Sequence, residues 1–201
     1  MRVCQLSRIN KYYRMHNAGR VVQGDILKDV MSIEWDITSE DTNDISLITK
    51  INFPYILILS QDCDLDHDFK NRNDQDAEKH DAYLQSILVC PAYLMAEFKD
   101  GVHLKELEMQ MEKKGGDNWK KIKKNLDPRY HYLPSYTQFQ IPELIIDFKH
   151  YYTVPVKFLY QVYPEHYVAS IEELFRESLC QRFSFYLSRI GLPELSNEII
   201  P

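Results

Sequence analysis

Two runs of consecutive apolar residues stand out from the mixed sequence around them. One is Pro54–Ser60 and the other is Ser86–Pro91. Short apolar runs with polar neighbours are typical of strands buried in the middle of a sheet. Apolar and polar residues alternate through 33–37 and 45–51, which predicts two further strands with one exposed face. The polar stretch 39–44 separates these two strands and is predicted to be a turn.

Strand patterns return at three other places. Residues 20–28 form an apolar segment that a Gly-Asp pair interrupts. Residues 144–148 and 151–158 are also rich in apolar and β-branched residues, which favour strands. Pro155 in the last of these segments predicts an edge strand or a bulge, because proline cannot donate a hydrogen bond to a sheet.

Helical spacing is found near the start of the chain and again in its middle. A short helix is expected over 3–15. Residues 92–114 carry apolar residues three and four positions apart, which predicts a helix that breaks near Gly101 and ends at the following pair of glycines. A short basic helix or loop is expected over 118–124, which contains Trp119.

The last part of the chain gives the clearest helical pattern. Ser170 and Glu173 have the spacing of a capping box, and Gly191 stands where a C-terminal cap belongs. Between them, apolar residues recur at helical spacing and form one wide face. These residues are Ile171, Leu174, Phe175, Leu179, Phe183, Tyr186, Leu187 and Ile190. We expect the longest helix of the protein over 170–190, with this face buried.

The order of these elements indicates the fold class. Strands, a helical insertion, more strands and a final helix predict a mainly β fold of the α+β class, a small β-barrel with helices packed outside it. A length of 201 residues suits one domain, 1–201. Its parts are predicted to be a barrel core at about 20–91 and 140–160, a helical insertion at about 92–125, and the C-terminal helix.

Composition limits the classes of protein to consider. Hydrophobic residues make up 44% of the chain and charged residues 27%, which is typical of a globular protein rather than a disordered one. No apolar run approaches the ~20 residues of a membrane span, and the basic N-terminus has no apolar core for export. We therefore expect a cytoplasmic protein with no membrane contact. The four widely spaced cysteines favour free thiols.

The charge is unevenly distributed. A net charge of −6 argues against nucleic-acid binding over the whole surface. Residues 1–20 nevertheless hold five bases and no acid, and residues 113–129 hold seven bases and two acids, whereas residues 62–81 hold eight acids and three bases. The two basic stretches could contact nucleic acid, although solvated surface is the simpler interpretation.

Alternating aspartates follow the first buried run, at Asp62, Asp64, Asp66 and Asp68. An EF-hand calcium loop is excluded, because this segment lacks the glycine and the final glutamate of that loop. No cofactor is expected; Mg²⁺ held by Asp62 and Asp64 is the metal site to test. The simpler interpretation is an ordered turn at the end of the strand, in which Asp62 or Asp64 accepts backbone hydrogen bonds.

Gln61 and Cys63 lie beside these aspartates and are further candidates for binding. A nucleophilic Cys63 paired with a histidine is conceivable. The neighbouring carboxylates would raise the pKa of its thiol, however, and a raised pKa opposes the reactive thiolate.

A second group of candidates lies in the basic stretch and just after it. His131 could act as a general acid or base. Arg129 could contact an anion, and Tyr132 could stack on a base. Trp119 lies among lysines that could contact phosphates. Aromatic residues beside prolines more often anchor a loop on a core, so a structural role is the alternative for each of them.

Four segments, in this order, resemble the MazF/PemK family of toxins. They are Gly24-Asp25-Ile26, Pro54–Ser60, Ile87–Pro91 and Leu144–Leu159. With the last helix they cover about half of the chain. The resemblance implies an SH3-like barrel, which is usually dimeric in that family, and endoribonuclease activity.

The departures from the family pattern concern its catalytic residues. Phe53 stands where the resemblance would place a catalytic arginine, and Ala92 and Tyr93 stand where it would place a catalytic threonine or serine. No catalytic residue therefore carries over. The chain also resembles uncharacterised bacterial proteins that share a Ser-Gln-x-Cys-Asp-Leu turn, here Ser60–Leu65.

Two functions remain as hypotheses. The first is a non-catalytic binding or accessory subunit of a bacterial toxin–antitoxin or phage-defence system, which would bind a protein partner or a second copy of itself. The alternative is an endoribonuclease-type enzyme with a rearranged active site in the Gln61–Asp64 turn. That enzyme would use Asp62 and Asp64 with a metal, or His131 as general acid or base.

Overall fold

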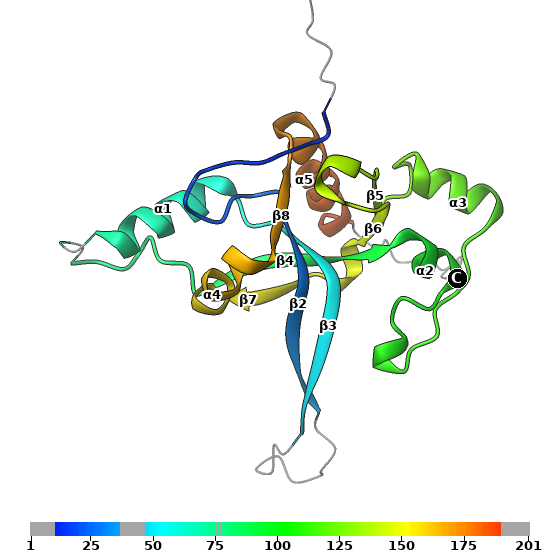
Figure 1. Ribbon diagram of the computed structural model, residues 1–201, viewed down its shortest axis with the longest axis horizontal. Helices are drawn as coiled ribbons and strands as arrows, with labels where there is room; N and C mark the ends of the chain where they lie inside the picture. Colours follow the sequence, from blue (N-terminus) through cyan, green and yellow to red (C-terminus); the bar gives the residue numbers. More distant parts are fainter. Residues whose placement is uncertain (1–10, 37–46, 75, 77, 190–201) are drawn as a thin grey trace, which may run out of the picture.

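The computed structural model describes residues 11–36, 47–74, 76 and 78–189 (Figure 1). These residues form a mixed α/β structure. In chain order the elements are β1 (Tyr13–Arg14), β2 (Asp25–Asp36), β3 (Leu47–Ile58), α1 (Asp62–Asn73), β4 (Ser86–Leu94), α2 (Met95–Asp100), η1 (Lys105–Leu107), α3 (Gly116–Lys123), β5 (Tyr130–Leu133), η2 (Thr137–Phe139), β6 (Leu144–Asp147), η3 (Phe148–His150), β7 (Tyr152–Pro155), α4 (Val156–His166), β8 (Tyr167–Ile171) and α5 (Glu173–Leu187).

The strands form one antiparallel sheet in the order β1-β8-β2-β3-β4-β6-β5. β4 holds the middle of this sheet. One of its edges pairs with β3, and its other edge pairs first with β7 and then with β6. In the described part of the chain the end strands β1 and β5 do not pair with each other, so the sheet is open and a closed barrel is not observed.

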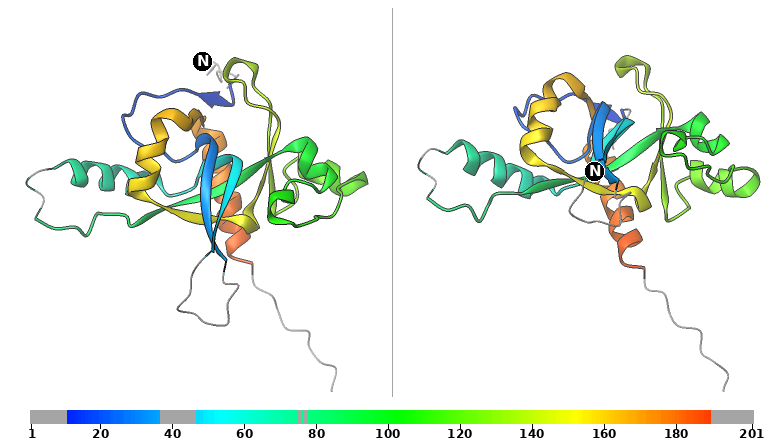
Figure 2. Two further views of the ribbon diagram at one scale, coloured as in Figure 1. Left: turned by 60° about the horizontal axis from the view of Figure 1, so that its bottom comes forward. Right: turned by 90° about the horizontal axis from the view of Figure 1, so that it is seen from below.

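Alternating side chains of the sheet enter two separate cores. On one side, Leu27, Ile56 and Val89 pack with apolar residues of α1, α2, α3 and α4. On the other side, Ile26 and Leu57 pack with the buried face of α5. Figure 2 shows α5 and α4 on opposite sides of the β2–β3 ribbon, while α1 and the α2–α3 segment project at the two ends.

The predicted strands of the first half are confirmed. The two segments expected at 45–51 and 54–60 form a single strand, β3, and the run at 86–91 is β4. The segment at 20–28 is strand only from Asp25 onward, because Gly24 adopts a left-handed φ of 88° and turns the chain into β2. The turn expected at 39–44 lies outside the described residues.

The helix expected over 92–114 is much shorter. α2 ends at Asp100, where Gly101 caps it with a left-handed φ of 73°. A side chain at this position would collide with the backbone carbonyl of Met111, so only glycine fits. The glycine pair expected to end this helix instead precedes and begins α3 (Gly116–Lys123), which confirms the short basic helix.

Four elements differ from the sequence-based expectation. The segment at 151–158 is strand only as far as Pro155, after which the missed helix α4 begins. The missed strands β5 and β8 are four and five residues long. The helix expected over 3–15 lies mostly outside the described residues, and Tyr13–Arg14 at its end form β1 instead.

The final helix is confirmed as the longest α-helix of the described residues, at 15 residues. Its predicted face is buried at Leu179, Phe183 and Tyr186, whereas Leu174 and Leu187, expected in the same face, are exposed. The expected capping box is wrong: Glu172 is the N-cap, and Ser170 belongs to β8. No described helix is long and apolar enough to cross a membrane.

A buried carboxylate joins the parts of this fold. Asp25 at the start of β2 is 0% exposed. Its oxygens accept hydrogen bonds from the hydroxyls of Ser170 (2.6 Å) and Tyr163 (2.8 Å), the amide of Val22 (2.7 Å), and the imidazole of His16 (2.9 Å). These donors come from β8, α4 and the chain before β2. The charge is therefore compensated by four converging donors, as a buried carboxylate requires.

The ring of His16 takes part as a neutral donor. Its Nδ1 accepts the amide N–H of Ala18 at 3.1 Å. The proton of the ring therefore lies on Nε2, which faces Asp25. Tyr167 extends the network by sharing a 2.8 Å hydrogen bond with Ser170.

Removing one of these donors should destabilise the whole domain. We expect Tyr163→Phe to lower the free energy of unfolding by about 1.5–3 kcal/mol, because it removes a hydrogen bond to a buried charge. Urea denaturation measures the change. The matched control is Tyr136→Phe, because the Tyr136 hydroxyl bonds only to exposed Gln138. Equal stability of the two variants would contradict the role of the network.

Candidate functional site

The Ser60–Leu65 segment forms the start of a helix rather than a turn at the end of the strand. β3 ends at Ile58, and α1 begins at Asp62 with Gln61 as its N-cap. Alternate residues of a helix do not share a face. Asp62 and Asp66, four residues apart, therefore share one face and both contact Arg20, whereas Asp64 lies on another face.

Asp62 holds α1 against the chain that precedes β2. Both of its oxygens accept hydrogen bonds from the guanidinium of Arg20 at 3.0 Å. Asp62 Oδ1 also accepts the backbone N–H of Gln23 at 3.3 Å, so the expected backbone hydrogen bond is present. Burial opposes ionisation of Asp62, but Arg20 and the Gln23 amide outweigh it and hold the pKa of the carboxyl below its usual value. Asp62 is therefore committed to a structural ion pair.

The other candidates of this segment lie on the outer side of α1. Gln61, Cys63 and Asp64 are exposed. The thiol of Cys63 lies 3.6 Å from the amide oxygen of Gln61. Across the described residues, no three His, Cys, Asp or Glu side chains are arranged to hold a metal ion. Magnesium at Asp62 and Asp64 remains a prediction.

His131 does not join this group. It is 2% exposed in β5, and its Nε2 lies 3.3 Å from the hydroxyl of Tyr12. Figure 1 shows β5 and α1 on opposite sides of the molecule. Burial, helped by the charge of Arg182, lowers the pKa of His131 to about 3. The ring is neutral and enclosed near neutral pH, so the structure gives it a packing role in place of the expected acid–base role.

Three other predicted residues, Trp119, Arg129 and Tyr132, lie in neighbouring segments. Trp119 belongs to α3, Tyr132 to β5 and Arg129 to the bend before β5, and each takes part in a contact between a cation and an aromatic ring. The distances from the cation to the ring centroid are 5.9 Å for Lys99–Trp119, 5.0 Å for Lys123–Tyr132, 5.9 Å for Lys114–Tyr130 and 4.9 Å for Arg129–Tyr130. We call these seven residues the basic–aromatic face.

The backbone explains why these side chains meet. β5 carries Tyr130 and Tyr132 at alternate positions, so their side chains point to the same side of the sheet. Ile122 of α3 is buried in the same core as Tyr130, which fixes the basic helix beside this strand. Lys123 is held at Tyr132 by Glu143, which accepts hydrogen bonds from both.

A polar network beneath this face was missed by the sequence analysis. Arg129 donates two hydrogen bonds to buried Asp147, at 2.8 and 2.6 Å. His150 Nε2 lies 3.6 Å from the same carboxylate, and its Nδ1 lies 2.9 Å from the hydroxyl of Tyr93. The ring of His103 packs on Tyr93 at a centroid distance of 4.6 Å. Five side chains able to bind or move protons therefore lie together.

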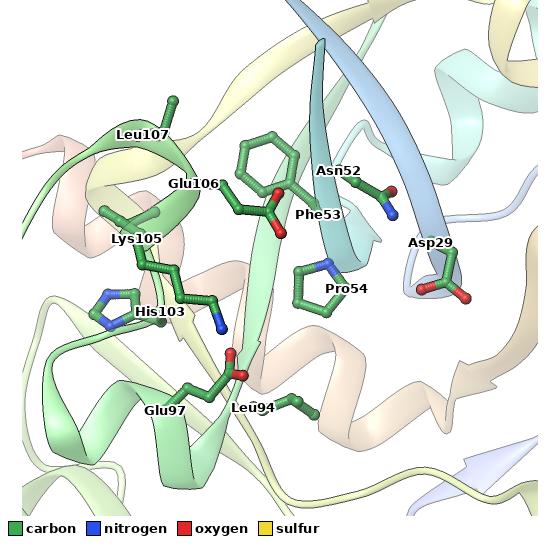
Figure 3. A pocket seen from close by; sticks show the side chains of 11 residues that line it. Asp29, Asn52, Phe53, Pro54, Leu94, Glu97, His103, Lys105, Glu106 and Leu107 are labelled. Atoms are coloured by element: carbon green, nitrogen blue, oxygen red, sulfur yellow. The ribbon is translucent and has the colours of Figure 1, made fainter.

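His103 separates two cavities. One has a volume of about 140 Å³ and is lined by Lys114, Arg129 and Tyr130 among others. The other, shown in Figure 3, has a volume of about 230 Å³ and lies between β3 and the α2–η1 segment. Both ring nitrogens of His103 are buried. Burial, reinforced by His150, lowers the pKa of His103 to about 4, although Asp147 and the Glu97 carbonyl oppose the shift.

No spacing in the sequence could have identified this network. Tyr93, His103, Arg129 and Asp147 come from four different segments, and none belongs to a local motif with its partners. The one available signal was Asp147, an acid at the end of an otherwise apolar strand.

The position of His131 should make folding sensitive to acid. Its pKa is about 3 in the folded protein, below the ordinary value of 6.5. The unfolded chain therefore takes up the proton first, and stability is lost as the pH falls below about 6.5. Between pH 7 and pH 5 the loss from this residue should be about 2 kcal/mol. Urea denaturation at both pH values should show a smaller loss for His131→Phe than for the unmodified chain.

The control for this measurement is His67→Phe, a change of exposed His67 on α1. It should leave the pH dependence of the unfolding free energy unchanged. An identical pH dependence for His131→Phe and the unmodified chain would contradict the assignment.

Comparison with known proteins adds no identity. The sequence matches no protein-family model and no curated protein. The resemblance to MazF/PemK toxins therefore rests on the four quoted segments alone. A function has to be argued from the site geometry described above.

Proposed function

We propose that the protein is a binding module that holds single-stranded nucleic acid on its basic–aromatic face. It would serve as a cytoplasmic, non-catalytic accessory subunit of a bacterial toxin–antitoxin or phage-defence system. The segment order that resembles MazF/PemK toxins supports this biological setting and an SH3-like origin for the curved antiparallel sheet. On this proposal, the open strand order would be a divergent form of that barrel.

The observation that carries the proposal is the pairing of cations with aromatic rings. Trp119 and Tyr132 pack at the edge of the core that contains buried Tyr130, and each of the three rings has a lysine or arginine within 6 Å of its centroid. Proteins that bind single strands combine stacking rings with cations that follow the phosphates. Trp119 and Tyr132 are half-buried, so an edge or face of each ring remains accessible.

Two cations of the α3 segment add positive charge, on a different side of the helix from Trp119. Lys121 and Lys124 are exposed on α3 and make no ion pair with any described residue. Unpaired lysines are available to contact phosphates and to release counterions. Lys120 and Lys123 are partly neutralised by Asp117 and Glu143. The face therefore carries local positive charge on a protein whose net charge is −6.

The positions of the predicted catalytic side chains support a binding role over catalysis. Asp62 is occupied by Arg20, and His131 is enclosed beside Tyr12. Using either side chain for proton transfer would require breaking a contact that holds two elements together.

Reversing the charge of the free lysines should weaken binding. We expect Lys121→Glu/Lys124→Glu to lower the affinity for a labelled single-stranded 12-mer RNA, measured by fluorescence anisotropy at 50 mM salt. The slope of log affinity against log salt should become shallower by about 1.4, since each contact to a single-strand phosphate contributes about 0.7.

The matched control is Lys79→Glu/Lys157→Glu, which changes the net charge equally at two exposed lysines away from the face. Equal effects of the two double variants would show that total charge, rather than the face, governs binding. Absence of RNA binding by the unmodified chain at 50 mM salt would refute the proposal.

Nucleic-acid cleavage at the Gln61–Asp64 segment is the alternative. The exposed carboxylate of Asp64 favours it, because a metal could approach this side chain from solvent. Our proposal predicts no cleavage of single-stranded RNA, with or without Mg²⁺. Cleavage that requires Mg²⁺ and is lost in Asp64→Asn would establish the alternative. Cleavage without metal that is lost in His103→Ala or His150→Ala would instead place an active site in the network around Tyr93.

A further inference from the structure

The larger cavity beside His103 has an apolar floor. It lies between the β2–β3 ribbon and the α2–η1 segment, and its volume is about 230 Å³. Its apolar lining is formed by Phe53, Pro54, Leu94, Leu104 and Leu107 (Figure 3). Typical small-molecule sites have volumes of about 300–1,000 Å³. The cavity is therefore better matched in size to one long side chain than to a cofactor.

The rim of the cavity is acidic. Glu97, Glu106 and Asp29 line it, opposed by Lys105. Glu97 and Glu106 make no ion pair within 4.0 Å in the described part of the chain, and Asp29 pairs weakly with Lys28 at 3.6 Å. In Figure 3 the two glutamate carboxylates project into the space above the apolar floor.

His103 adds a neutral acceptor to the same cavity. Its ring nitrogens are buried, and the ring interacts with the backbone carbonyl of Glu97. With a pKa lowered to about 4, mainly by burial, the ring is neutral near pH 7. A neutral imidazole offers one lone pair to a hydrogen-bond donor. The unpaired polar groups of the cavity are therefore mainly hydrogen-bond acceptors. A cation with several hydrogen-bond donors would satisfy them.

We propose that this cavity receives an arginine side chain from a partner protein. The planar guanidinium can lie over Phe53 and Pro54 while its fixed fork of N–H groups reaches Glu97 and Glu106. The methylene stem would cover the leucines of the floor. This inference names the chemistry of the partner for the accessory role proposed above, and it does not depend on nucleic-acid binding.

Charge distinguishes this occupant from others. A phosphate or nucleotide would be repelled by the three carboxylates of the rim. Lysine is a less suitable occupant, because its ammonium is a compact point charge that binds water strongly and cannot stack. An apolar side chain would bury the carboxylates without compensating them, which is costly.

The test compares four pentapeptides that differ only at their central residue. Acetyl-Gly-Gly-Arg-Gly-Gly-amide and its Lys, citrulline and norleucine counterparts are titrated into the ¹⁵N-labelled full-length chain. We expect the Arg peptide to shift the amide resonances of Phe53, Glu97 and His103. We also expect it to bind about tenfold more tightly than the citrulline peptide, which has nearly the same shape without the charge.

Variants of the rim locate the binding. Glu97→Gln/Glu106→Gln should reduce Arg-peptide affinity about tenfold. Glu108→Gln/Glu177→Gln, which changes two exposed glutamates outside the cavity, should leave it unchanged. The rim variant should still bind the single-stranded RNA, so failure of this inference is distinguishable from failure of the nucleic-acid proposal.

Three outcomes would overturn the inference. The first is equal binding of the citrulline and Arg peptides, and the second is resonance shifts confined to the acidic α1 segment. The third is no resonance shift at 10 mM peptide, which is about ten times the Kd of even a weak, 1 mM complex. Full Arg-peptide affinity in the rim variant would exclude Glu97 and Glu106 as its ligands.

Discussion

The carboxylate of Asp25 is the group on which the rest of the fold depends. A fully buried charge without a cationic partner is tolerated only where donors surround it. Here Ser170, Tyr163, His16 and the Val22 amide supply one donor each. Because these donors come from β8, α4 and the N-terminal chain, the charge can be buried only when all three are in place. The network therefore requires β8, α4 and the N-terminal chain to pack correctly around the first residue of β2.

The sequence predicted the elements whose signal is local. Alternation and apolar runs identified β2, β3 and β4, and helical spacing identified the buried face of α5. The elements that were predicted wrongly are determined by tertiary contacts. Ser170 has a good capping-box sequence, but its hydroxyl is used by Asp25, 145 residues away in the chain. The sequence predicted that the strand would continue past Pro155 to residue 158. The residues after Pro155 instead form helix α4, which buries Val156 and Leu159 in the core.

The candidate site shows the same limit more strongly. The aspartate-rich motif attracted attention as a candidate metal site, because four closely spaced carboxylates repel one another unless they are paired. The helix resolves this repulsion, since Arg20 meets Asp62, Lys70 meets Asp66 and Arg72 meets Asp68. Most aspartates of this motif therefore form ion pairs that stabilise α1 and its packing. The side chains around His103 are dispersed over four segments, and only the pairing of β4, β5 and β6 brings them together.

β4 explains how an acidic cavity and a basic face can operate side by side. Its residue Tyr93 contacts both His103, in the wall of the acidic cavity, and His150, which leads through Asp147 to Arg129. Charges in solvent are screened over about 10 Å at ordinary ionic strength, so two surfaces of opposite sign can act separately although they share a support.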